Sequence, residues 1–138
     1  MLANRRAGIL LHPSSLPGKA DQGDFGHDAF RFIEFLAASG FSVWQTLPLG
    51  PTHSDLSPYQ SFSVHAGNPY LISIDWLVDH GWIPSSALNE TDVNGEYRQA
   101  CLQNAYTGFC QQADEEMRNA YRKFIKEKAD WLHDYALY

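Results

Sequence analysis

The sequence predicts an α/β fold in which parallel strands alternate with helices. Two short apolar runs, residues 8–11 and 41–47, flank a segment of helical periodicity within the first 50 residues. A strand, a helix and a strand at this spacing form the right-handed crossover that joins parallel strands. A second observation is that apolar residues recur at helical spacing from about Glu96 onward. We therefore expect a parallel sheet at the start of the chain and helices after it.

The first two elements are bounded by residues that break regular structure. Gly8–Leu11 is a continuous apolar run that ends at His12-Pro13, and such runs are typical of strands buried on both faces of a parallel sheet. Ala29–Ser39 repeats apolar residues at helical spacing, with Asp28 as a suitable N-cap and Gly40 as a suitable stop. We therefore expect a buried strand followed by a helix.

A second strand and further helices are expected downstream. Phe41–Leu47 is rich in β-branched and aromatic residues and predicts a strand. Tyr70–Ile74 is a further apolar stretch, and Asp75–His80, which ends at Gly81, predicts a short helix. From about Glu96 the apolar positions predict helices, whose aromatic stripe we expect to be core that faces barrel or subdomain partners. These apolar positions are Tyr97, Cys101, Leu102, Ala105 and Phe109 in one segment and Met117, Tyr121, Phe124, Ile125, Trp131, Leu132 and Tyr135 in another.

The predicted sheet is incomplete. A parallel sheet must be covered on both faces, and two or three strands with helices on one side leave an unpaired apolar edge. Residues 134–138 keep apolar side chains up to the last position, whereas a terminus commonly frays into polar residues. We therefore expect this chain to be part of a larger protein.

The composition excludes several classes of partner. The chain has 138 residues, of which 44% are hydrophobic and 19% charged, as in a soluble globular domain. With 16 acidic and 10 basic residues the formal charge is -6, and no run of basic residues is longer than two. We therefore expect neither nucleic acid nor a membrane as partner. Cys101 and Cys110 lie nine residues apart in a helical pattern, beyond disulfide reach, which indicates reduced thiols and a cytoplasmic protein.

The sequence carries no pattern for a metal, an organic cofactor or a serine nucleophile. No two of the six histidines are three or four residues apart, and no Cys-x-x-Cys accompanies them, so we expect no metal. The isolated glycines do not form a dinucleotide-binding fingerprint. Ser14 and Ser15 lie near His12 but not in a Gly-x-Ser-x-Gly motif, and a turn before Pro17 explains them.

The stretch Leu47–Tyr70 is the first place to look for a ligand. It combines Gly and Pro with small hydroxyl residues and aromatic residues, and it has almost no apolar periodicity. Such segments are typically binding loops, and this one follows the carboxyl end of a strand, where α/β proteins place their ligands. Its Tyr59 is either a ligand contact or an amphipathic packing residue, and the residues alone favour packing.

Five motifs occur in one order within the first 70 residues. They are His12-Pro-Ser-Ser-Leu-Pro-Gly18, Gly23-Asp-Phe-Gly26, Trp44-Gln-Thr-Leu-Pro-Leu-Gly-Pro-Thr52, Ser57-Pro-Tyr-Gln-Ser-Phe-Ser63 and Ala66-Gly-Asn-Pro69. Together they closely resemble the amino-terminal part of the amylomaltases. The segment 131–138 also resembles that family, so the likeness runs along essentially the whole chain and is weakest between Pro84 and Gln112.

The resemblance implies a 4-α-glucanotransferase, which transfers α-1,4-glucan segments between maltooligosaccharides by a retaining, covalent mechanism. Amylomaltases are (β/α)8 TIM barrels of roughly 500 residues, about twice a minimal barrel. Residues 1–138 would thus form the truncated amino-terminal part of one catalytic domain, with a helical subdomain at about 84–138. The fragment would be inactive without the missing remainder of the barrel and would use no cofactor. The alternative is a stand-alone, non-catalytic glucan-binding or interaction module.

The resemblance also assigns residues to the glucan. A retaining transfer needs two carboxyl groups about 5 Å apart, and no position of this chain matches them, so no catalytic residue is assigned. Tyr59 would lie against the glucosyl ring in the subsite of the covalent intermediate, and Ser57 beside it would be the second substrate-binding residue. Some amylomaltases hold glucan at a secondary site through a tyrosine where this chain has Ser54. The residues expected to support the loop are Trp44, Gln45, Pro48, Gly67 and Asn68.

Overall fold

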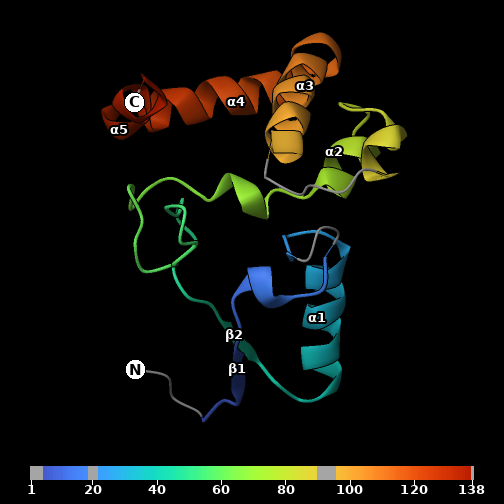
Figure 1. Ribbon diagram of the computed structural model, residues 1–138, viewed down its shortest axis with the longest axis vertical. Helices are drawn as coiled ribbons and strands as arrows, with labels where there is room; N and C mark the ends of the chain where they lie inside the picture. Colours follow the sequence, from blue (N-terminus) through green and yellow to red (C-terminus); the bar gives the residue numbers. More distant parts are fainter. Residues whose placement is uncertain (1–4, 19–21, 90–95, 138) are drawn as a thin grey trace.

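The computed structural model describes residues 5–18, 22–89 and 96–137. The strands and the first helix occupy one end of an elongated molecule, and the last three helices occupy the other (Figure 1). A long irregular stretch after the second strand lies between these two ends. In chain order the elements, with η for a 3-10 helix, are β1 Gly8–Leu10, η1 Pro13–Ser15, α1 His27–Ala38, β2 Val43–Gln45, η3 Pro69–Leu71, α2 Ile74–Asp79, η4 Ser85–Asn89, α3 Glu96–Gln112, α4 Glu115–Glu127 and α5 Ala129–Leu137.

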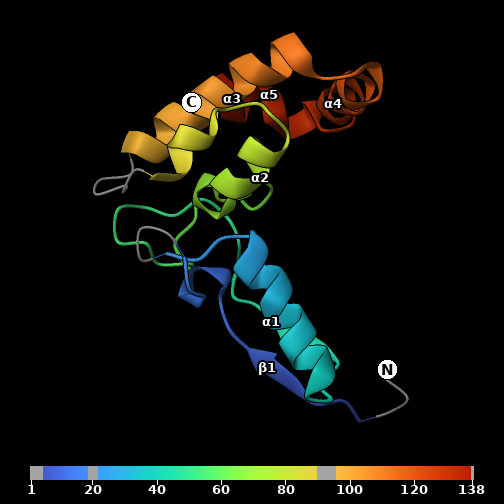
Figure 2. The same ribbon diagram turned by 90° about the vertical axis from the view of Figure 1, so that its right-hand side faces the viewer.

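β1 and β2 form a two-stranded parallel sheet, which confirms the predicted crossover. α1 runs alongside β1 (Figure 2). Gly8 pairs with Val43, and a Cβ on Gly8 would lie 2.8 Å from the Val43 carbonyl oxygen, so glycine permits the close pairing. The prediction of strands buried on both faces is wrong, because no residue of β1 is buried and Leu10 is 57% exposed. β2 is shorter than the predicted Phe41–Leu47 because β1 pairs with only three of its residues.

The boundaries of α1 correct one predicted cap. The helix begins at His27, and its N-cap is Gly26, whose N–H donates to the Asp24 carboxylate at 2.8 Å. The prediction of Asp28 as the cap is wrong, since this residue lies in the first turn, where its charge suits the helix N-terminus. The predicted stop at Gly40 is confirmed by its φ of 81°, which favours glycine.

α2 starts one residue earlier than predicted because Ser73 is its N-cap. The Ser73 hydroxyl accepts a hydrogen bond from the Trp76 N–H at 3.4 Å. Gly81 ends this helical turn with a φ of 69°, which confirms the predicted stop. The apolar stretch before α2 contains η3 and leaves the described sheet with two strands.

The buried core of the helical end lies between α2 and α3. Its four buried residues are Leu77, Ile83, Cys101 and Ala105. Gly108 of α3 makes this packing possible, because a Cβ there would lie 2.2 Å from the Trp82 carbonyl oxygen. Cys101 and Cys110 are both free and lie on α3, as the helical pattern predicts.

That the aromatic residues of the last helices pack as core against barrel or subdomain partners stays a prediction for α4 and α5. Neither helix contains a buried residue, and Tyr121, Phe124 and Ile125 are exposed. The chain has 10041 Å² of accessible surface, whereas a compact protein of this mass has about 7,200 Å². The open arrangement of the elements explains the difference. Among the helices that the structure describes, none is long and apolar enough to span a membrane.

Candidate functional site

The stretch that follows β2 is a closed loop rather than an extended linker. Its ends are joined by a hydrogen bond from the Asn68 N–H to the Leu49 carbonyl oxygen at 2.8 Å. Within the loop, Thr52 and Ser61 form an isolated antiparallel bridge. Gly50 allows the two limbs to approach, because a Cβ there would lie 2.4 Å from the Ser61 hydroxyl oxygen. We call residues 49–68 the Tyr59 loop.

A β-turn at the tip of this loop presents Tyr59. The Ser57 carbonyl oxygen accepts from the Gln60 N–H at 3.1 Å, and Pro58 occupies the second turn position, which its fixed φ suits. The Asp55 carboxylate accepts from the Ser57 N–H at 3.1 Å and so holds the start of the turn. Tyr59 is 72% exposed. The turn therefore fixes the backbone while leaving the phenol ring accessible to a ligand.

The limb of the loop after the tip is held by side-chain hydroxyl groups. The Ser63 hydroxyl accepts from the N–H groups of His65 at 3.2 Å and Ala66 at 3.0 Å. The Ser61 hydroxyl donates to the Ser63 carbonyl oxygen at 2.8 Å. These short-range bonds give the limb a defined conformation although it has no regular secondary structure.

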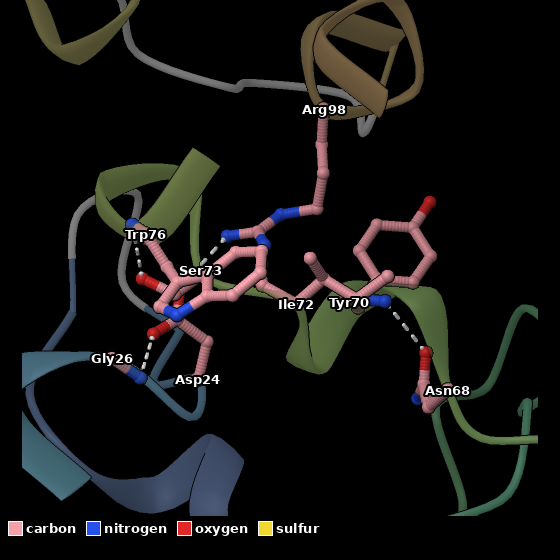
Figure 3. A network of polar contacts seen from close by, with 8 residues as sticks. All are labelled: Asp24, Gly26, Asn68, Tyr70, Ile72, Ser73, Trp76 and Arg98. Atoms are coloured by element: carbon pink, nitrogen blue, oxygen red, sulfur yellow. Dashed lines mark hydrogen bonds and ion pairs between the residues drawn. The ribbon is translucent and has the colours of Figure 1, made fainter. Parts of the chain in front are cut away.

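Asn68 closes the loop and starts η3. The residue is 8% exposed, and its Oδ1 accepts from the Tyr70 N–H at 2.9 Å (Figure 3). Beside this exit a pocket of about 300 Å³ is lined by Pro69, Tyr70, Arg98, Gln99 and Leu102. The end of the Tyr59 loop is therefore built into the contact between η3 and α3.

A buried ion pair next to this exit joins three segments of the chain. Arg98 of α3 is 9% exposed, and its Nη1 donates to the Ile72 carbonyl oxygen at 2.6 Å (Figure 3). Its Nη2 lies 3.6 Å from Oδ2 of Asp24, the residue that also accepts from Gly26. Burial raises the pKa of Asp24, while the nearby Arg98 charge opposes that rise. Arg98 thus connects the start of α1, the segment after η3, and α3.

Sequence reasoning did not identify Arg98 or its partner. Asp24 lies in the Gly-Asp-Phe-Gly motif, so that motif was the available signal. Nothing local marks Arg98, because an isolated arginine on a helix is more commonly a solvated residue than a buried one. The contact joins residues far apart in the sequence, which periodicity does not detect.

The residues expected to support the loop occupy different places. Trp44 Nε1 donates to the Leu11 carbonyl oxygen at 2.8 Å, and its ring lies 5.1 Å from the Phe32 ring, so it joins the sheet to α1. Gln45 pairs with Leu10 in the sheet. Pro48 and Gly67 are exposed. Of the five, Asn68 makes a hydrogen bond that closes the loop.

The arrangement is suited to binding rather than to bond cleavage. Asp55 is the one carboxylate in the Tyr59 loop, and it is engaged with the Ser57 N–H. A retaining glycosyl transfer requires a pair of carboxyl groups on either side of the scissile bond. Within residues 5–18, 22–89 and 96–137, no three His, Cys, Asp or Glu side chains are grouped as metal ligands would be.

Comparison with known proteins gives a consistent assignment. The family profile described as 4-alpha-glucanotransferase matches residues 11–138. The 4-alpha-glucanotransferases of Synechocystis and Thermus thermophilus are each 43% identical to this chain, over 100% and 97% of its length. The solved amylomaltase from Streptococcus agalactiae, in complex with acarbose, matches 96% of the chain with a TM-score of 0.83 and 35% identity.

These matches cover only part of the relatives. The chain spans 29% of the Synechocystis protein and 28% of the Thermus thermophilus protein and of the Streptococcus agalactiae amylomaltase. The family profile nevertheless covers nearly all of this chain, and the structural match covers 96% of it. The chain belongs to the 4-alpha-glucanotransferase family.

Proposed function

We propose that this chain is the opening part of a 4-α-glucanotransferase and that its Tyr59 loop contacts the glucan. The reaction would transfer α-1,4-glucan segments between maltooligosaccharides with retention of configuration. The observation that carries the proposal is that Tyr59, in the Ser-Pro-Tyr-Gln motif, is 72% exposed on a turn whose backbone is fixed by hydrogen bonds.

The chemistry of Tyr59 suits a sugar. The face of a phenol ring packs against the apolar C–H face of a glucosyl ring, and its hydroxyl group can exchange hydrogen bonds with sugar hydroxyls. Ser57, two residues before it, is half-buried and starts the same turn. We infer that Ser57 sets the backbone conformation of the turn and that Tyr59 supplies the contact.

The catalytic carboxyl groups are assigned to segments that this chain does not contain. Among the described residues, the parallel β1-α1-β2 unit has an unpaired strand edge. This arrangement supports a position for the chain at the start of a (β/α)8 barrel. On this proposal residues 1–138 belong to one catalytic domain, and residues from about 84 onward form its helical subdomain. The two free thiols support a cytoplasmic location.

A stand-alone glucan-binding module is the second candidate. It is favoured by the single carboxylate of the Tyr59 loop, which cannot supply the pair that a retaining transfer needs. Both candidates require Tyr59 to touch the sugar. They differ in the reaction that the complete protein performs.

Titration of the 138-residue chain with maltoheptaose, followed by two-dimensional NMR, tests the contact. We expect Tyr59→Ala to weaken binding about tenfold, since an aromatic contact of this kind contributes about 1.4 kcal/mol. Tyr121→Ala is the matched control, because Tyr121 is also an exposed tyrosine but lies on α4. Equal dissociation constants for the two variants, or no binding by the unaltered chain, would contradict the proposed contact.

An activity assay separates the two candidates. The 138-residue chain alone should not disproportionate maltotriose, because the carboxylate pair is absent from its loop. The chain extended by its downstream reading frame should do so if the protein is a glucanotransferase. Turnover by the 138-residue chain itself would show that the carboxyl groups lie within it.

A further inference from the structure

We propose that Trp131 of α5 is a positioning residue for the Tyr59 loop and that it acts through His65. This inference rests on the proposed function of Tyr59 as a sugar contact. The indole ring of Trp131 and the imidazole ring of His65 are stacked, with centroids 5.4 Å apart and an interplanar angle of 26°. This contact joins the last helix to the limb of the loop that follows its tip.

The His65 side of the contact is fixed to the rest of the loop. Its N–H donates to the Ser63 hydroxyl, which also accepts from Ala66, so His65 sits within a short hydrogen-bonded turn. The loop closes shortly afterwards, where the Asn68 N–H donates to the Leu49 carbonyl oxygen. An anchor at His65 therefore restrains the limb between the Tyr59 turn and the loop exit.

The Trp131 side of the contact is not part of a buried core. Trp131 is partly buried, its ring lies 6.0 Å from that of Tyr135 on the same helix, and α5 contains no fully buried residue. Replacement of the indole consequently opens no interior cavity. Loss of the indole ring should therefore act mainly on the loop. The effect on the loop can then be measured separately from any effect on the stability of the fold.

Amide hydrogen exchange in the 138-residue chain measures this restraint. We expect Trp131→Ala to accelerate exchange of the Ala66 and Asn68 amides by about 2- to 12-fold, the range that an aromatic pair of this kind supports. The Leu11 amide, which donates to the Gln45 carbonyl oxygen in the sheet, serves as the internal reference and should not change. His65→Ala removes the other ring of the stack and should accelerate exchange of the same two amides to the same extent.

Two further variants distinguish positioning from a loss of stability. Trp131→Phe keeps an aromatic face and should restore most of the protection. Tyr135→Ala removes the other ring beside Trp131 but leaves the stack on His65, so the two loop amides should keep their exchange rates. Unchanged loop exchange in both Trp131→Ala and His65→Ala, or equal acceleration at Leu11, would overturn the inference.

Binding of maltoheptaose then connects the restraint to function. We expect Trp131→Ala to weaken binding severalfold, and to have no further effect in a Tyr59→Ala background, because it acts by placing that ring. If Tyr59→Ala leaves affinity unchanged, the proposed sugar contact fails whatever Trp131 does. If Tyr59→Ala weakens binding and Trp131→Ala does not, the sugar contact stands and the positioning role is overturned.

Discussion

Replacement of Arg98 by leucine should destabilise the chain by about 3 kcal/mol. The guanidinium loses its bond to the Ile72 carbonyl oxygen, at 2.6 Å, and its ion pair with Asp24, at 3.6 Å. Breaking a buried ion pair from one side costs about 3–5 kcal/mol, because the remaining charge is left without compensation. The Asp24 side chain is 20% exposed and keeps its hydrogen bond from the Gly26 N–H, so we expect a cost at the lower end of this range.

Urea and thermal unfolding of the 138-residue chain, followed by circular dichroism, measures this cost. A loss of 3 kcal/mol corresponds to a fall in Tm of about 10 °C for a domain of this size. Arg122→Leu is the matched control, since Arg122 is an exposed arginine whose ion pair with Glu115 should contribute less than about 1 kcal/mol. If Arg98→Leu shifts stability no more than Arg122→Leu, the account of Arg98 as a buried clamp is incorrect.

Two further predictions concern the same packing. The folded-state pKa of Asp24 is raised by burial, so its contribution to stability is present below the unfolded pKa of 3.8 and is lost as pH rises through the raised value. As pH rises across this range, the denaturation midpoint of the unaltered chain should therefore fall relative to that of Asp24→Asn. A difference between the two midpoints that stays constant with pH would contradict the raised pKa. Gly108→Ala should cost about 2 kcal/mol or more, because its Cβ would lie 2.2 Å from the Trp82 carbonyl oxygen, a backbone atom. Gly67→Ala, where no atom lies within 4 Å of the added Cβ, should change the free energy of unfolding by less than about 0.5 kcal/mol in the same assay.

Local signals in the sequence predicted the elements that depend on local structure. The crossover from β1 through α1 to β2 followed from two apolar runs and one helical period, and Gly40 and Gly81 marked helix ends because a left-handed backbone favours glycine. The cap of α1 was misassigned because the carboxylate that holds Gly26 comes from Asp24, outside the helix. Burial of the first strand was also misjudged, since a short apolar run shows which residues could pack and not whether a partner covers them.

For the candidate site, too, the local features were predictable from the sequence and the long-range contacts were not. Its position after β2 was predictable from glycine, proline and hydroxyl residues, whose turn preferences are local. The long-range contacts were not predictable, neither that of the loop, where His65 meets Trp131, nor that beside its exit, where Asp24 meets Arg98, because both form only after the chain has folded back on itself. Stacking and ion pairing between distant segments leave no periodic signal in the sequence.

The helical end is thus joined to the rest of the chain at two places, Arg98 and Trp131, whose loss should have different consequences. Arg98 is buried beside the loop exit, so its replacement exposes uncompensated polar groups and lowers the free energy of global unfolding. Trp131 contacts the loop from a helix without buried residues, so its replacement should release the loop while the fold persists. If both held only the fold, the two variants would accelerate exchange at Leu11 and Ala66 alike. Acceleration at Ala66 alone in Trp131→Ala, and at both amides in Arg98→Leu, would show that order in the loop is set separately from the stability of the chain.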